Sequence, residues 1–233
     1  MPITLVTGAS RGIGRAICLR LARDGHELVA AARHRLELDA LCAEIEQAGG
    51  RARALVLDVS DGAAVASALA NIRVDNLVNN AGVGRLKPFL DTSPEEWHAM
   101  IDVNVNALYH VTRAVLPAMT ANGAGHVCTI GSISGRSAFV GGTCYAATKA
   151  FVTSWAESLL LEVREYGVKV SVVMPGSVAT SFSGREPSPD DAWKLAPEDV
   201  ADAVAYVLGT PPSVLVHRAE IRTLTSPPKK PGR

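Results

Sequence analysis

The sequence predicts an α/β fold: a doubly wound, mostly parallel, seven-stranded sheet with helices on both faces, of the Rossmann type. Two observations predict it. Strand-like and helix-like segments alternate along the whole chain, and such alternation builds a parallel sheet through right-handed crossovers. Most of the strand-like segments are continuous apolar runs, as expected for strands that are covered on both faces.

The expected strands are short runs that end in turn-forming or polar residues, and they cover residues 3–7, 27–32, 52–58, 76–79, 126–130, 169–174 and 220–224. The expected helices lie between them, at about 13–24, 35–48, 61–71, 94–121, 145–165 and 197–208. Ser93, Pro94 and Glu96 provide an N-cap, a first-position proline and a capping-box glutamate, and Pro197 opens the last helix.

The chain has 233 residues, of which 48% are hydrophobic, and this is enough to bury a large core. No repeat or linker divides it, so residues 1–225 are interpreted as a single dinucleotide-binding and catalytic domain. Residues 181–195, rich in Pro, Ser, Asp and Gly, are expected to form a substrate loop. Residues 226–233 are expected to be a disordered tail.

The charge balance and the apolar runs of the sequence indicate which binding partners and which cellular location to expect. There are 23 basic and 23 acidic residues, and no basic stripe precedes Lys229 and Lys230. We therefore expect no nucleic-acid partner and no attraction to anionic lipid. The sequence opens directly into a strand and contains no apolar run of about 18 residues, so we expect no membrane association and a cytoplasmic location.

The cysteines and histidines show no metal-ligand spacing, so no metal is expected. The cysteines are interpreted as reduced thiols. Cys144 precedes Tyr145, and the sequence leaves open whether its thiol is reactive.

A glycine-rich turn follows the first strand and enters the first helix. Such a turn lets the backbone approach a pyrophosphate, and the helix N-terminus offers free N–H groups. The residues that we expect to bind a dinucleotide there are Gly8, Ser10, Arg11, Gly12, Ile13 and Gly14.

The end of the second strand bears on the choice of cofactor. An acidic residue at this place would accept from the ribose 2′-hydroxyl and repel a 2′-phosphate, but the chain has Ala32 and Arg33 there. An arginine can pair with the phosphate, so NADP(H) is predicted to be preferred over NAD(H). The alternative is that Arg33 is only a solvated loop charge.

Tyr145 and Lys149 are four residues apart and share one face of a helix, with Ser132 upstream. Lowering the pKa of a phenol from about 10 to about 7 requires roughly 4 kcal/mol, which one cation at about 4 Å provides at an effective dielectric near 20. We therefore expect Lys149 to lower the pKa of Tyr145, which would donate a proton to a carbonyl reduced by hydride. Each residue alone could be structural.

These motifs, in this order, resemble the short-chain dehydrogenase/reductase family over essentially the whole chain. The resemblance implies catalytic roles for Asn104, Ser132, Tyr145 and Lys149. It also implies a homodimer or homotetramer built on the helices at 94–121 and 145–165. The further cofactor contacts that it implies are Asp58, Val59, Asn80, Ala81, Gly82, Tyr145, Lys149, Pro175, Gly176, Val178 and Thr180.

The predicted function is therefore NADP(H)-dependent hydride transfer between nicotinamide and a small-molecule carbonyl or secondary alcohol. The alternatives are a 3-oxoacyl-thioester reductase and, from another class, a dinucleotide-sensing regulator without turnover. A carrier-bound thioester would require a basic patch, for which the candidates are Arg85, Lys87, Arg136 and Arg185. Phe139, Phe182, Trp193 and Leu195 either line the substrate pocket or pack elsewhere.

Overall fold

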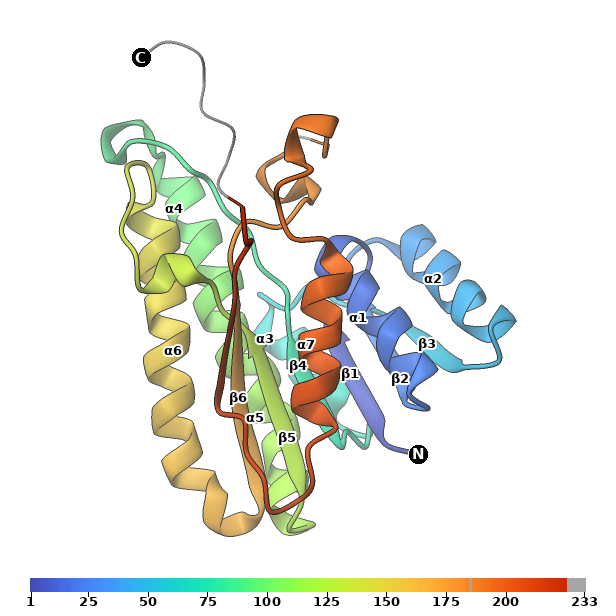
Figure 1. Ribbon diagram of the computed structural model, residues 1–233. Helices are drawn as coiled ribbons and strands as arrows, with labels where there is room; N and C mark the ends of the chain where they lie inside the picture. The colour runs from blue at the N-terminus through green and yellow to red at the C-terminus, as the bar shows by residue number, and fades with distance from the viewer. Residues whose placement is uncertain (185, 226–233) are drawn as a thin grey trace.

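A parallel sheet forms the centre of the computed structural model, which describes residues 1–184 and 186–225 (Figure 1). Its seven strands lie in the order β3-β2-β1-β4-β5-β6-β7 and pair in parallel throughout. They are β1 Ile3–Thr7, β2 Glu27–Ala32, β3 Arg51–Val56, β4 Asn76–Asn79, β5 Gly125–Ile130, β6 Val168–Pro175 and β7 Arg218–Ile221.

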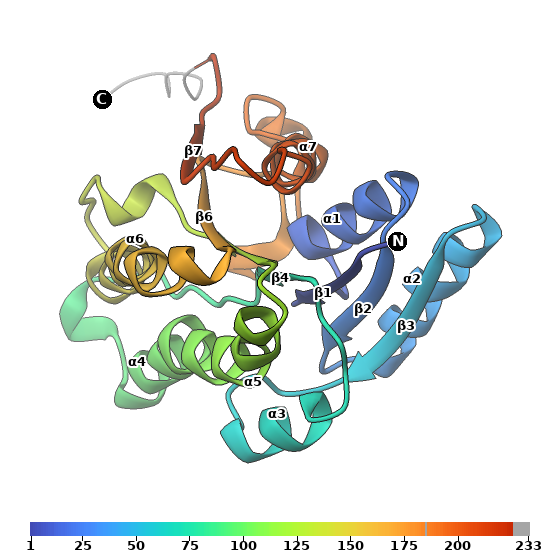
Figure 2. The ribbon, with the colours of Figure 1, turned by 90° about the horizontal axis from the view of Figure 1, so that it is seen from below.

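The helices cover both faces of the sheet (Figure 2). They are α1 Gly12–Arg23, α2 Arg35–Gln47, α3 Gly62–Leu69, α4 Pro94–Ile101, α5 Ala107–Ala121, α6 Thr143–Val163 and α7 Pro197–Leu208. Helices α1, α2 and α7 contribute to one apolar core, whereas α3, α5 and α6 contribute to the other. The predicted fold class is thus confirmed.

Alternation along each strand divides its side chains between these two cores. On β1, Leu5 belongs to the core beneath α3, α5 and α6, and Val6 to the core beneath α1, α2 and α7. Both are fully buried. Burial of one such side chain contributes about 1.5–3 kcal/mol, so a strand that is apolar at every position is stabilised from both sides.

The prediction of one continuous helix over 94–121 is wrong in the middle of that range. The chain forms α4, then a π-helical turn over Asp102–Asn106, and then α5. A π-helical turn admits an extra residue into the helix, and here that turn contains the buried Asn104. The seventh strand also lies earlier than expected, because Val172 to Pro175 of β6 pair with Arg218 to Ile221 rather than with residues up to 224.

The topology places a cleft at one edge of the sheet. Strand order reverses between β1 and β4, and the carboxyl ends of strands at such a switch point leave a crevice where ligands bind. No helix within the described residues is long and apolar enough to cross a membrane. The single-domain interpretation stays a prediction, and its expected tail, 226–233, lies outside the described residues.

Candidate active site

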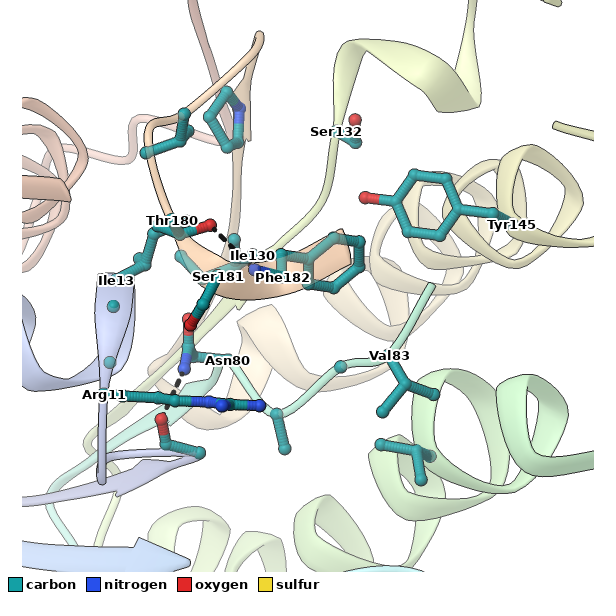
Figure 3. A pocket seen from close by; sticks show the side chains of 18 of the residues that line it. Arg11, Ile13, Asn80, Val83, Ile130, Ser132, Tyr145, Thr180, Ser181 and Phe182 are labelled. Carbon is teal, nitrogen blue, oxygen red and sulfur yellow. Dashed lines mark hydrogen bonds between the residues drawn. The ribbon is translucent and has the colours of Figure 1, made fainter. Parts of the chain in front are cut away.

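A cleft of about 520 Å³ follows the carboxyl edge of the sheet (Figure 3). It is lined by the loops that follow β1 to β6 and by the first turns of α6. All of the sequence-predicted site residues line it except Asn104. The loop after β1 forms one end of the cleft, and Ser132 and Tyr145 lie toward the other (Figure 3).

The turn after β1 has a shape that only glycine permits. Gly8 and Gly12 have φ values of +66° and +54°, in the left-handed region that other residues rarely adopt. A Cβ on Gly14 would lie 2.2 Å from the carbonyl oxygen of Gly8. The helix N-terminus therefore lies directly against the turn, with free N–H groups close to the cleft floor.

Asn80 joins this turn to the end of β4. Its side-chain amide donates to the carbonyl oxygens of Thr7 at 2.9 Å and Gly8 at 3.2 Å. The backbone N–H groups of Asn80 and Ala81 each donate to the Thr7 hydroxyl at 3.0 Å. The loops on either side of the switch point are thereby held as one unit, and Gly82 continues along the cleft wall.

Arg33 and Asp58 lie side by side at the rim, after β2 and β3. Their closest charged atoms are 3.8 Å apart, and the Arg33 side chain is 61% exposed. An exposed pair at this distance is worth little, so the guanidinium remains available to a bound phosphate. Partial burial raises the pKa of Asp58, but hydrogen bonds from Ser60 and the nearby Arg33 outweigh this and lower it overall.

Tyr145 and Ser132 lie together inside the cleft, and the phenol hydroxyl points into it beside Ser132 (Figure 3). Tyr145 belongs to the first turn of α6, and Ser132 follows β5. The Ser132 hydroxyl accepts from the backbone N–H of Ser134 at 3.1 Å, which fixes its position. Burial raises the pKa of Tyr145, and a hydrogen bond with Ser132 opposes that rise.

Lys149 is buried beneath the tyrosine. Its ammonium donates to the main-chain carbonyl of Ile130 at 2.8 Å and lies 5.9 Å from the centre of the Tyr145 ring. Burial lowers the pKa of Lys149 to about 8. The expected lowering of the Tyr145 pKa by Lys149 is not found, because desolvation of the buried phenol dominates.

Asn104 reaches the site through the backbone rather than through the cleft. Its side-chain oxygen accepts from the Val83 N–H at 2.9 Å, and its nitrogen donates to the Val83 carbonyl at 2.8 Å and to the Thr148 hydroxyl at 3.1 Å. These contacts fasten the π-helical turn to α6 and to the loop after β4. Both N–H groups of the amide are thus used, so the side chain positions the site. Its expected part in a proton relay stays a prediction.

The loop after β6 forms the remaining wall. Gly176 donates its N–H to the Ile221 carbonyl at 2.8 Å, and Ala179 and Leu195 join the two ends of the loop through a hydrogen bond of 2.8 Å. Pro175, Gly176, Val178 and Thr180 all line the cleft. Part of the expected substrate loop, Arg185, lies outside the described residues.

Of the four residues named as candidates for the substrate pocket, Phe139 and Phe182 line the cleft, whereas Trp193 and Leu195 are not among its lining residues. The Phe182 ring lies 5.5 Å from that of Tyr145. Leu195 is buried against the loop. Cys144 is buried, and desolvation raises the pKa of its thiol, which disfavours the reactive thiolate.

Several residues that shape the site were not predicted. Gly84 is one, since a Cβ there would lie 2.4 Å from the Phe182 ring and 3.4 Å from the Tyr145 ring. Val83 and Ile130 act through their main chains, which carry no signal in the sequence. Thr148, between Tyr145 and Lys149, could have been found from its place on the buried face of the helix.

A dinucleotide fits this cleft. The crowded glycine turn leaves no room for a Cβ on Gly14, and it opens toward the helix N-terminus as a pyrophosphate cradle does. Arg33 lies beyond it at the rim, and Tyr145, Lys149 and Ser132 lie at the far end. Fold and site together define a dinucleotide-dependent oxidoreductase.

The chain belongs to the short-chain dehydrogenase family, because the model of that family matches residues 2–190. An NADP-dependent 3-hydroxy acid dehydrogenase of Salmonella typhi is 36% identical, over 96% of this chain and 95% of that protein. Sulfoacetaldehyde reductase 2 of Chromohalobacter salexigens is 37% identical, over 94% and 93%. The closed form of serine dehydrogenase complexed with NADP+ is similar in structure, with a TM-score of 0.86, 36% identity and 94% of each chain covered.

Proposed function

We propose that the chain is an NADP(H)-dependent oxidoreductase that transfers a hydride between nicotinamide and a small-molecule carbonyl or secondary alcohol, with Ser132, Tyr145 and Lys149 as its catalytic residues. The observation that carries this is their meeting, at one end of a dinucleotide cleft, around a phenol that points into it. NADP-dependent relatives that are similar over almost the whole chain support the same activity.

The residues that would hold the cofactor follow the cleft from rim to centre. The turn from Gly8 to Gly14 would bind the pyrophosphate, and Arg33 would pair with the 2′-phosphate. Asp58 and Val59 would flank the adenine, the Asn80–Gly82 segment would line the middle, and Val178 with Thr180 would hold the carboxamide. When bound, the nicotinamide supplies or accepts the hydride.

Three residues of the protein would stabilise the charge that develops on the substrate oxygen and supply the proton that it receives. When a carbonyl is reduced, negative charge develops on its oxygen, and the hydroxyls of Ser132 and Tyr145 would donate to it. Tyr145 would then transfer its proton. The Lys149 ammonium, held by Ile130, would stabilise the phenolate that remains, because the buried surroundings strengthen the attraction between the charges.

The names of the relatives suggest where to look for a substrate. The Salmonella protein is named for 3-hydroxy acids and the structural neighbour for serine, and both are small molecules with a carboxylate beside a hydroxyl. We therefore propose small hydroxy acids, or the corresponding oxo acids, as the first substrate class to test.

The alternatives have less support. Of the basic patch required by a carrier-bound thioester, Lys87 contacts Glu96 and Arg136 contacts Glu220, whereas Arg185 lies outside the described residues. A sensor without turnover would not require the buried ammonium beneath the phenol.

We further propose a cytoplasmic homodimer or homotetramer. The exposed Phe151 and Leu161 on α6 support the assembly, and the buried, free cysteines support the location.

The test is a turnover screen with both cofactors. Purified protein is assayed at 340 nm against hydroxy acids, oxo acids, neutral secondary alcohols and ketones, with NADP(H) and with NAD(H). We expect turnover of at least one class, faster with NADP(H), and its loss in Tyr145→Phe. Tight NADPH binding without turnover of any compound would instead favour the sensor.

A further inference from the structure

Arg85 lines the cleft, and within the described part of the chain its one ion-pair contact is a long one. Its side chain is 52% exposed, with its nearest carboxylate oxygen, on Glu96, 4.0 Å away. An exposed arginine in such a cleft, whose counter-ion is at the outer limit of an ion pair, is a candidate to bind an anion.

Glu96 is held by other groups. One of its oxygens contacts the Lys87 ammonium at 2.6 Å, and the other accepts from the Ser93 N–H at 3.2 Å as part of the cap of α4. The contact with Lys87 is the main reason that the pKa of Glu96 is lowered. Lys87 is thus the close partner of Glu96, whereas Arg85 is 4.0 Å from the same oxygen, so the Arg85 guanidinium keeps most of its N–H donors for a ligand.

The backbone of Arg85 is fixed close to the catalytic tyrosine. Its N–H donates to the sulfur of the fully buried Met100 at 3.4 Å. A Cβ on the preceding Gly84 would lie 3.4 Å from the Tyr145 ring. A guanidinium nitrogen of Arg85 lies 3.5 Å from the Gly84 carbonyl oxygen. The segment that carries the cation therefore forms the part of the cleft wall that faces the Tyr145 ring.

The other cations at this end of the described cleft are engaged. Lys194 contacts Asp191 at 2.7 Å, and Lys149 donates to Ile130 beneath the phenol. Arg11 and Arg33 belong to the dinucleotide end. Among residues that the structure describes, Arg85 is the cation best placed to meet a charged group on the substrate.

We propose that Arg85 binds the carboxylate of a hydroxy-acid substrate and so selects acids over neutral alcohols. The inference rests on the proposed function. A guanidinium presents parallel N–H donors that match a carboxylate. A substrate whose hydroxyl lies on Ser132 and Tyr145 would extend a carboxylate one or two carbons away toward Arg85, which lines the same cleft. The contact between Arg85 and the carboxylate would be the same in the bound substrate and in the transition state. Its loss should therefore raise KM more than it lowers kcat.

The test compares 3-hydroxybutanoate with its methyl ester, which keeps the hydroxyl and removes the charge. In the wild type, kcat/KM should be higher for the acid. Arg85→Gln should lower kcat/KM for the acid by about 10- to 150-fold, the range for charged hydrogen bonds, mainly through KM, and should change the ester less than about threefold. Arg85→Lys keeps the charge but loses the two parallel N–H donors. Its kcat/KM for the acid should lie between the values for the wild type and Arg85→Gln.

Arg136→Gln is the matched control, because Arg136 is an exposed arginine in the loop after β5 whose partner is Glu220. It should leave the ratio of acid to ester unchanged. NADPH titration and a thermal melt show whether each variant is folded. An equal loss for acid and ester in Arg85→Gln would overturn the inference.

The two proposals fail differently. A wild type that oxidises neutral secondary alcohols with NADP+ but prefers the ester to the acid would overturn the role of Arg85 and leave the oxidoreductase intact. A wild type that binds NADPH and turns over neither acid, ester nor neutral alcohol would overturn the proposed function, and the role of Arg85 with it.

Discussion

The ammonium of Lys149 donates a hydrogen bond of 2.8 Å to the main-chain carbonyl of Ile130, the last residue of β5. The contact joins a buried cation to the sheet edge rather than to a carboxylate. A carbonyl accepts from the ammonium without cancelling its charge, so a positive charge remains 5.9 Å from the centre of the Tyr145 ring. The cation is therefore a fixed part of the site before any ligand binds.

Replacement of Tyr145 by Phe tests whether the Tyr145 hydroxyl is the general acid of the reaction. The change removes the hydroxyl and keeps the ring that packs on Phe182, so we expect kcat to fall by about 10²- to 10⁴-fold with NADPH affinity nearly unchanged. Stopped-flow turnover and fluorescence titration measure the two. Tyr166→Phe, at an exposed tyrosine, is the control, and near-normal turnover in Tyr145→Phe would remove the phenol from the mechanism.

The lowered pKa of Lys149, about 8 in the protein without ligand, predicts a pH dependence. Below about pH 8 the amine is charged, and above it the charge is lost, so kcat/KM for carbonyl reduction should decline as pH rises through 8. Lys149→Arg keeps its charge over this range and should abolish the decline, although its longer side chain lowers the rate. A profile with the same break in wild type and Lys149→Arg would assign the titration to another group.

Much of this site could be predicted from the sequence, because the Gly8–Gly14 turn and the Tyr145–Lys149 pair are short-range patterns whose geometry the helix and turn enforce. What could not be predicted depends on the backbone of distant segments. The π-helical turn at Asp102–Asn106 has no glycine or proline to mark it, and its contacts are with Val83 and Thr148. The pKa of Tyr145 was predicted in the wrong direction, because burial of the phenol cannot be judged from an i, i+4 spacing.

The shift of the seventh strand has a similar cause. The strand was expected near residues 220–224, but its partner sets its place. Val172 of β6 pairs with Arg218, and the Val172 N–H donates to the carbonyl of His217. An edge strand with one neighbour takes its register from that neighbour rather than from its own pattern.

A buried histidine outside the cleft predicts acid sensitivity. His126 on β5 shares a hydrogen bond of 2.8 Å with the Ser171 hydroxyl, and burial lowers its pKa to about 4. The unfolded chain therefore binds the proton more readily than the folded one between about pH 6.5 and 4. The contribution is fully present above pH 6.5 and is lost as pH falls through this window, by on the order of 3 kcal/mol.

Urea unfolding at intervals from pH 7 to 4.5 measures this effect. His126→Gln should lower stability at pH 7 but flatten its fall with acid relative to the wild type. His98→Gln, at an exposed position of α4, should leave the slope as it is. Parallel curves for wild type and His126→Gln would place the acid-sensitive group elsewhere.

The last prediction concerns the choice of cofactor, which depends on Arg33 at the end of β2. Its one close carboxylate among the described residues, on Asp58, is 3.8 Å away across an exposed rim, so a 2′-phosphate would meet a guanidinium that is nearly free. Each charged phosphate contact is worth about 1.5–3 kcal/mol, or about 10- to 150-fold. Arg33→Asp removes that contact, repels the phosphate and offers an acceptor to a ribose hydroxyl, so the ratio of kcat/KM for NADPH to that for NADH should collapse or invert. Arg35→Gln, two residues along and paired with Asp39, is the control that keeps the ratio. Equal values for both cofactors in the wild type, or an unchanged ratio in Arg33→Asp, would show that the 2′-phosphate is read by another residue.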